Sequence, residues 1–192
     1  YDNHVWGIQP GYSQDQVGAV SLLARMEIAG LDVGNRWQQL AEYLRPRAAD
    51  TIQPFLTLQY LYGLARADFA EADRLMQAVE DKAQSSYAFD RLVWRDVALP
   101  AARGVLAHAR RNWFDAARYL GIANPRMTEI GGSHAQRDLF GQMHLDALTR
   151  AGALADAQDV LQRQLRAQPE SLRLKRQARP LYAALGLAQL AP

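Results

Sequence analysis

Apolar residues recur along this chain with the spacing of one helical face. In three places a large side chain lies three residues before an alanine, and more large side chains follow the alanine at +3 and +4. These units are Phe69/Ala72/Leu75/Met76, Trp113/Ala116/Tyr119/Leu120 and Leu154/Ala157/Val160/Leu161. Positions −3, 0, +3 and +4 lie on one side of an α-helix. Each unit therefore predicts a helix with an apolar stripe and a small residue where a neighbouring helix approaches closely.

The three alanines lie 44 and 41 residues apart, and a fourth unit, Trp37/Leu40/Tyr43/Leu44, precedes them with leucine in place of alanine. Recurrence at such distances is typical of stacked helix pairs. No segment alternates apolar and polar residues as a half-buried strand does. The pattern predicts an all-α fold, an α-solenoid of about four helix pairs plus a C-terminal capping helix.

Proline, glycine and serine residues mark the expected helix ends. Pro54 fits the first turn of a helix, and Gly152 fits a left-handed position just after one. Pro100 falls inside a long helical stretch, residues 89–110, and predicts a bend there because proline lacks an N–H group.

Two S-x-x-Q sequences predict capping boxes at helix starts. Ser13 with Gln16 is the first, and Ser133 with Gln136 is the second. In such a box the serine hydroxyl accepts from the third backbone N–H, and the glutamine reaches back to the first.

The composition supports a single folded domain. The chain has 192 residues, of which 49% are hydrophobic and 22% charged, enough for a core. No apolar run approaches the roughly 20 residues of a membrane helix, so we expect no membrane partner. The absence of cysteine excludes disulfides and thiolate metal sites and fits a reducing compartment, so we expect a cytoplasmic location and no cofactor.

The net charge of +2 comes from a mixed surface of 22 basic and 20 acidic residues. One local excess of arginine runs from Arg163 to Arg179. Only Tyr182 is close enough to act as a stacking aromatic, so this segment does not predict nucleic-acid binding.

Three stretches carry a further signal: residues 33–38 (VGNRWQ), 95–100 (RDVALP) and 131–138 (GGSHAQRD). In sequence and order they resemble the tetratricopeptide repeat protein 38 family, over essentially the whole chain. The resemblance implies a degenerate tetratricopeptide-like solenoid that occupies residues 1–192 as one domain. It also implies a helical half upstream of Tyr1, so we expect this chain to be the C-terminal part of a longer one. The resemblance implies no settled biochemical activity.

His134 and Asp138 lie four residues apart near an expected helix start and can face one point. Such a pair can act as acid and base, but two ligands are too few for a metal, so we expect no metal site. In the alternative interpretation these residues only form the helix start, where Ser133 caps and Asp138 finds an arginine. The preceding Gly131 and Gly132 also fit an anion-binding turn.

Two Arg-Asp steps occur at similar distances before their repeat alanines: Arg95-Asp96 and Arg137-Asp138. Equivalent positions on successive first helices of a solenoid lie side by side. We therefore expect reciprocal ion pairs between the two steps, with substrate binding as the alternative.

Two functions fit these features. Stacked pairs leave a concave face that binds peptides, and we expect Arg95, Arg103, Arg137 and Tyr60 on it. The first hypothesis is therefore a protein-protein interaction scaffold of the tetratricopeptide-repeat type, with an acidic protein or peptide partner.

The second hypothesis is a small-molecule or anion-binding protein, or an enzyme, whose site an N-terminal half completes. Its contributors would be His4, His134 and Asp138, together with the three arginines. A closed cavity of roughly a few hundred Å³ with convergent polar groups would favour it, whereas an open groove would favour the scaffold.

Overall fold

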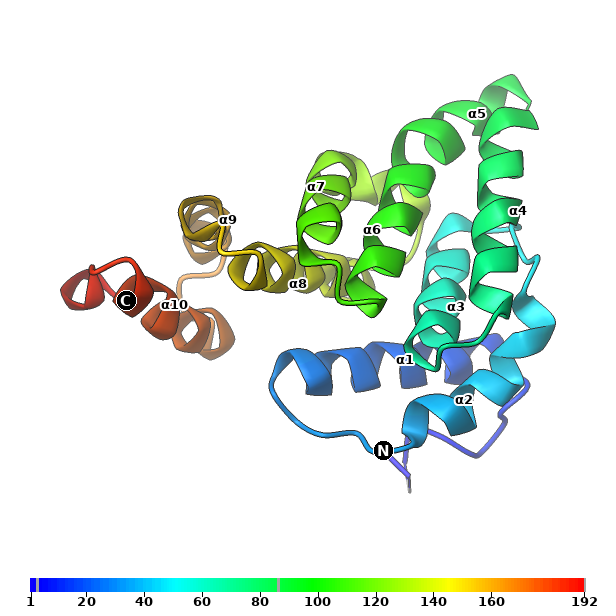
Figure 1. Ribbon diagram of the computed structural model, residues 1–192, viewed down its shortest axis with the longest axis horizontal. Coiled ribbons are helices and arrows are strands. Elements are labelled where there is room, and N and C mark those ends of the chain that lie inside the picture. The colour runs from blue at the N-terminus through cyan, green and yellow to red at the C-terminus, as the bar shows by residue number, and fades with distance from the viewer. Residues whose placement is uncertain (3, 86, 192) are drawn as a thin grey trace.

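The computed structural model describes residues 1–2, 4–85 and 87–191, and every regular element in these ranges is helical (Figure 1). The α-helices are α1 (Ser13–Ile28), α2 (Arg36–Leu44), α3 (Pro54–Arg66), α4 (Glu71–Ser85), α5 (Ala88–Val93), α6 (Leu99–Ala109), α7 (Trp113–Ala123), α8 (His134–Arg150), α9 (Leu154–Ala167) and α10 (Leu172–Ala184). Short 3-10 segments cover Arg45–Arg47, Asn124–Ile130 and Ala188–Leu190. The predicted all-α class is confirmed.

Several helix ends follow from local chemistry as predicted. Pro54 begins α3, and Gly152 follows α8 with a φ of 76°. The Ser133 hydroxyl accepts from the Gln136 N–H at 3.3 Å, and the Gln136 side chain accepts from the Ser133 N–H at 2.7 Å. This capping box fixes the start of α8.

The other predicted capping box is wrong. Tyr12 is the N-cap of α1 and makes no side-chain cap bond. Gln16 is buried and donates to the backbone carbonyl of Tyr43 at 3.1 Å, while the Ser13 hydroxyl accepts from Arg47 at 3.1 Å. Both side chains bond to distant residues instead of capping α1, because the start of α1 packs against α2 and the segment that follows α2.

The predicted bend before Pro100 takes the form of a π turn, Trp94–Ala98, between α5 and α6. The N–H of Leu99 donates to the carbonyl of Trp94, five residues back. Pro100 has no N–H to continue the ordinary i to i−4 series, and the wider turn accommodates this.

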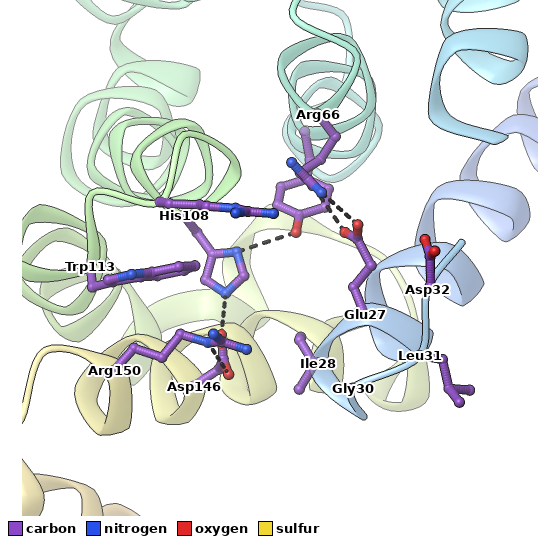
Figure 2. A pocket seen from close by; sticks show the side chains of 12 residues that line it. Glu27, Ile28, Gly30, Leu31, Asp32, Arg66, His108, Trp113, Asp146 and Arg150 are labelled. Carbon is purple, nitrogen blue, oxygen red and sulfur yellow. Dashed lines mark hydrogen bonds and ion pairs between the residues drawn. The ribbon is translucent and has the colours of Figure 1, made fainter. Parts of the chain in front are cut away.

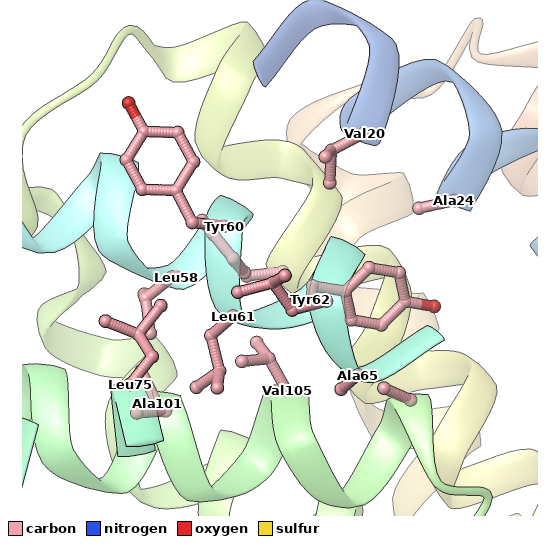
Figure 3. Packing of buried hydrophobic residues seen from close by; sticks show 14 of the residues in the cluster. Val20, Ala24, Leu58, Tyr60, Leu61, Tyr62, Ala65, Leu75, Ala101 and Val105 are labelled. Carbon is pink, nitrogen blue, oxygen red and sulfur yellow. The ribbon is translucent and has the colours of Figure 1, made fainter. Parts of the chain in front are cut away.

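Helix α3 is the centre of the larger core. Residues 57–65 are all buried, because α3 packs against α1, α2, α4 and α6. Leu61 faces Leu75 of α4 and Val105 of α6 (Figure 3). Tyr60, which we expected on an open concave face, is fully buried within this packing. That expectation is wrong because α3 has neighbours on every side.

Helices α1, α3, α6 and α8 close into a ring. Each packs against the next, and α8 packs back against α1. Across the ring, Phe55 of α3 meets Phe140 of α8 edge-on, with ring centroids 6.3 Å apart. An open stack of helix pairs leaves its first and fourth units apart. Here their contact fills the space in which the concave groove was expected.

The buried residues form two clusters. The larger one spans α1 to α4, the π turn, α6, the later half of α7 and the first half of α8, including Leu120 and Phe140. The smaller one joins the first half of α7, the second half of α8, α9 and α10, including Leu148 and Leu161. Figure 1 shows α9 and α10 at the end of the molecule away from α2 and α4. Helices α7 and α8 therefore belong to both clusters.

Gly104 sets the closest approach of α6 and α7. A Cβ at this position would lie 2.7 Å from Leu120 Cγ and 2.9 Å from Leu120 N. Because one of these atoms is backbone, a methyl group cannot be accommodated by side-chain rotation alone.

We therefore expect Gly104→Ala to lower the free energy of unfolding by about 1–3 kcal/mol, through overpacking. Denaturant titration monitored by circular dichroism measures this change. The matched control is Gly18→Ala in α1, where no heavy atom lies within 4 Å of the added Cβ. There the gain in helix propensity should stabilise the fold by about 0.5–1 kcal/mol. Equal effects of the two substitutions would contradict the close approach.

Candidate binding site

The carboxyl ends of α1, α3, α6 and α8 meet around a cavity of about 490 Å³ (Figure 2). Its lining residues are Glu27, Ile28, Gly30, Leu31, Asp32, Tyr62, Arg66, His108, Arg111, Trp113, Asp146 and Arg150. The cavity thus draws polar groups from helices that are far apart in the sequence.

A hydrogen-bonded chain of three side chains runs along the cavity wall. His108 Nδ1 lies 3.2 Å from the Tyr62 hydroxyl, and His108 Nε2 lies 3.1 Å from Asp146 Oδ2 (Figure 2). A carboxylate only accepts, so Nε2 carries a proton, and in the neutral imidazole Nδ1 then accepts from Tyr62. His108 is 5% exposed, and its two nitrogens are both satisfied.

Tyr62 acts as a hydrogen-bond donor in this chain. Burial raises the pKa of its hydroxyl well above the ordinary value, so the group stays protonated at neutral pH. This favours a role in positioning His108 over a role as a nucleophile.

Arg66 and Glu27 form a second polar unit on the opposite wall. Arg66 Nε donates to Glu27 Oε2 at 2.9 Å, and Nη2 donates to Oε1, so the pair is bidentate. Burial is the largest single influence on the pKa of Arg66 and lowers it, but the hydrogen bonds to Glu27 and the charge interactions with Glu27 and Tyr62 together raise the pKa above its ordinary value. The guanidinium also lies over the Trp37 ring at 5.8 Å, so it is held in place on several sides.

Asp146 is shared between His108 and Arg150, whose Nε lies 2.9 Å from Oδ1. Arg150 in turn covers the Trp113 ring at 4.9 Å, and Trp113 meets the His108 ring edge-on at 5.3 Å. The charge of Asp146 is thus compensated within the protein.

Arg111 differs from the other cavity arginines. It is exposed and has no ion-pair or side-chain hydrogen-bond partner in the part of the chain that the structure describes. Its φ of 61° is left-handed, and its N–H donates to the carbonyl of His108 while Asn112 N–H donates to that of Ala107. This is a Schellman ending of α6, in which glycine is the favoured residue at the position of Arg111.

The residues predicted as a site at the start of α8 do lie together, but at a different cavity from the one described above. His134, Arg137 and Asp138 line another cavity, of about 520 Å³, with His144 and Arg173. The Asp138 carboxylate accepts from Arg173 at 3.2 Å and lies 3.8 Å from Arg25, which is the arginine pairing expected of a helix start. His4 does not line this cavity.

The predicted reciprocal ion pairs between the two Arg-Asp steps are wrong. Arg95 pairs with its own neighbour Asp96, whose carboxylate also lies 3.6 Å from Arg126. Arg137 has no carboxylate partner among the described residues and donates instead to the carbonyls of Gly131 and Gly132. The left-handed glycines of this turn hold those carbonyls within reach of its guanidinium.

Arg95 and Arg103 do not join either cavity. Arg103 pairs with Glu80 at 3.0 Å and lies over the Tyr119 ring. The five residues expected to bind one ligand therefore fall into separate places, and three of them share a cavity.

Sequence reasoning missed the chain Tyr62–His108–Asp146. These residues precede Ala72, Ala116 and Ala157 by 10, 8 and 11 residues. A titratable or hydroxyl residue near the carboxyl end of each first helix was the signal that could have revealed the site.

No group of three metal-ligating side chains forms among the described residues. In the same residues no helix is long and apolar enough to cross a bilayer. No protein-family model matches the chain, and no solved structure matches it. The tetratricopeptide resemblance therefore stays a prediction.

We expect Tyr62→Phe to keep His108 in its Nε2–H tautomer, since Asp146 fixes the proton there. The lost hydrogen bond should lower the free energy of unfolding by about 1 kcal/mol. Long-range ¹H–¹⁵N spectra of the imidazole identify the tautomer. Asp146→Asn is the contrasting variant, in which the Nδ1–H form should become populated. A switch to Nδ1–H in Tyr62→Phe would contradict the assigned direction of the chain.

We also expect stability to fall as pH drops below about 6.5. Burial, followed by the charge of Arg163, lowers the pKa of His144 below its ordinary value of 6.5. Below that value the unfolded chain binds a proton that the folded chain does not, so unfolding becomes more favourable. Denaturant titration between pH 5 and 7.5 should show a shallower slope for His144→Gln. The exposed His134→Gln on the same helix is the matched control.

Proposed function

We propose that this protein binds a small organic acid in the cavity between α1, α3, α6 and α8. The observation that carries the proposal is the convergence of the Tyr62–His108–Asp146 chain and the Arg66–Glu27 pair on one cavity of about 490 Å³. Ligand sites of roughly 300–1,000 Å³ with a few placed polar groups are typical of small-molecule binders.

The lining has equal numbers of carboxylates and arginines, so an anionic ligand is favoured by Arg111 and not by net charge. Glu27 is paired with Arg66, and Asp146 is shared by His108 and Arg150. Asp32 is exposed and accepts from the N–H of Gly34. Arg111 is left as a cation without a carboxylate partner in the described chain, and a ligand carboxylate would supply one.

The left-handed position of Arg111 makes it a suitable residue for a test. A side chain at such a φ costs about 1 kcal/mol relative to glycine, so glycine can replace Arg111 and remove the guanidinium without straining the helix end.

The scaffold hypothesis has less support. The groove that it needs is filled by the contact of α1 with α8, and Tyr60 is buried. Arg95 and Arg103 are engaged with neighbouring carboxylates. A tetratricopeptide-like origin of the helix pairs remains our proposal, supported by the packing of each pair on the next and by the buried repeat alanines. A cytoplasmic location likewise remains a proposal.

We expect Arg111→Gly to raise the thermal unfolding midpoint and at the same time to weaken carboxylate binding by at least about tenfold. Calorimetric titration with benzoate and glutarate measures the affinity, with benzamide and glutaramide as uncharged controls. The unfolding midpoint rises because glycine adopts the left-handed φ without strain. Binding weakens because the guanidinium is lost.

The matched control is Asp68→Gly. Asp68 occupies the same position after α3, with a φ of 59°, and does not line the cavity. It should show the same gain in stability with unchanged binding. If wild-type protein binds no carboxylate, or if Arg111→Gly binds as well as wild type, the proposal is wrong.

A further inference from the structure

A separate cavity of about 320 Å³ lies between α1, α3 and the first turn of α8. Its lining includes Val17, Gly18, Leu22, Arg25, Phe55 and Gln59. We refer to this cavity as the Gln59 slot. It shares no lining residue with the cavity assigned to organic acids.

Several buried polar atoms have no hydrogen-bond partner in the described residues, among them Trp37 Nε1 and the Tyr60 hydroxyl, and Gln59 is the one such residue that lines the slot. Gln59 is 1% exposed, and neither its Nε2 nor its Oε1 has a hydrogen-bond partner in the described residues. The buried Gln16 donates to backbone carbonyls, and the buried Gln142 donates to Asp138. Because an unpaired buried amide is costly, such a group calls for an explanation beyond packing.

We propose that the Gln59 slot binds an uncharged amide with a short aliphatic group. The Gln59 side chain offers one acceptor and a pair of donors, the complement of another carboxamide or of a peptide group. Val17, Leu22 and Phe55 supply apolar contacts for the aliphatic part.

The charges around the slot favour a neutral ligand. Arg25 is the one charged residue among those that line it. Its guanidinium donates to the carbonyls of Ser21 and Ala135 and lies 3.8 Å from the Asp138 carboxylate. An ion in the slot would lose its hydration without gaining a free counter-charge.

Gly18 keeps one wall of the slot open. No heavy atom lies within 4 Å of the place where its Cβ would be. Glycine inside a helix is unfavourable relative to alanine, and a larger side chain here would extend into the slot.

The test is an NMR titration of the ¹⁵N-labelled chain with isobutyramide, followed at the side-chain amide of Gln59. The Gln59→Leu spectrum assigns that signal. We expect a saturable shift with isobutyramide and none with isobutyrate, which has the same shape but carries a charge.

Two variants decide between binding in the slot and binding elsewhere. Gln59→Leu should lose isobutyramide binding by about tenfold or more, and should also unfold at a higher temperature because it removes the unpaired amide. Gly18→Leu should lose binding while Gln59 is retained, because the added side chain fills the slot. Both should keep the carboxylate affinity of wild type.

Failure of isobutyramide to shift the Gln59 signal at its solubility limit would overturn the proposal and would indicate a slot that holds water only. Undiminished binding in either variant would overturn it as well. Neither outcome bears on the organic-acid cavity, whose test uses Arg111.

Discussion

The packing of α1 against α8 is the contact on which this structure depends. Without it, α1, α3, α6 and α8 would form a row with an open face, whereas with it they form a ring around a shared interior. Closure explains why α3 is buried along nearly its whole length and why apolar rings such as Phe55 and Phe140 meet across the middle. It also limits what can bind, because the remaining spaces match small molecules better than a folded partner.

Polar groups enclosed in a closed interior lose their hydrogen bonds to water. The two ends of this ring differ in how far the protein replaces those bonds. At the carboxyl ends of the helices, His108 is bonded on both sides, and the carboxylates of Glu27 and Asp146 are paired with arginines. At the other end the Gln59 amide is left without a partner. Burial of polar groups therefore has different results at the two ends. Around His108 the side chains are held by hydrogen bonds, whereas the Gln59 amide is free to bond to a ligand.

The sequence predicted those features that short stretches of chain determine alone. The repeat alanines, the start of α3 at Pro54 and the Ser133 capping box need only neighbouring residues. The prediction failed where distant segments compete, as when Gln16 bonds to Tyr43 instead of capping α1. The candidate site was hidden for the same reason, because Tyr62 and its partners lie on three helices and each alone resembles an ordinary core position.

The division of the core into two clusters has a consequence for how the molecule comes apart. Helices α9 and α10 rest only on the smaller cluster, so they can open as a unit while the ring stays closed. Asp146 lies on α8 next to Leu145, the first residue of this helix that belongs to the smaller cluster. Amide protons of the C-terminal hairpin should therefore exchange with solvent earlier than those of α3. Ligand occupancy next to Asp146 should slow this exchange at a distance from the bound molecule.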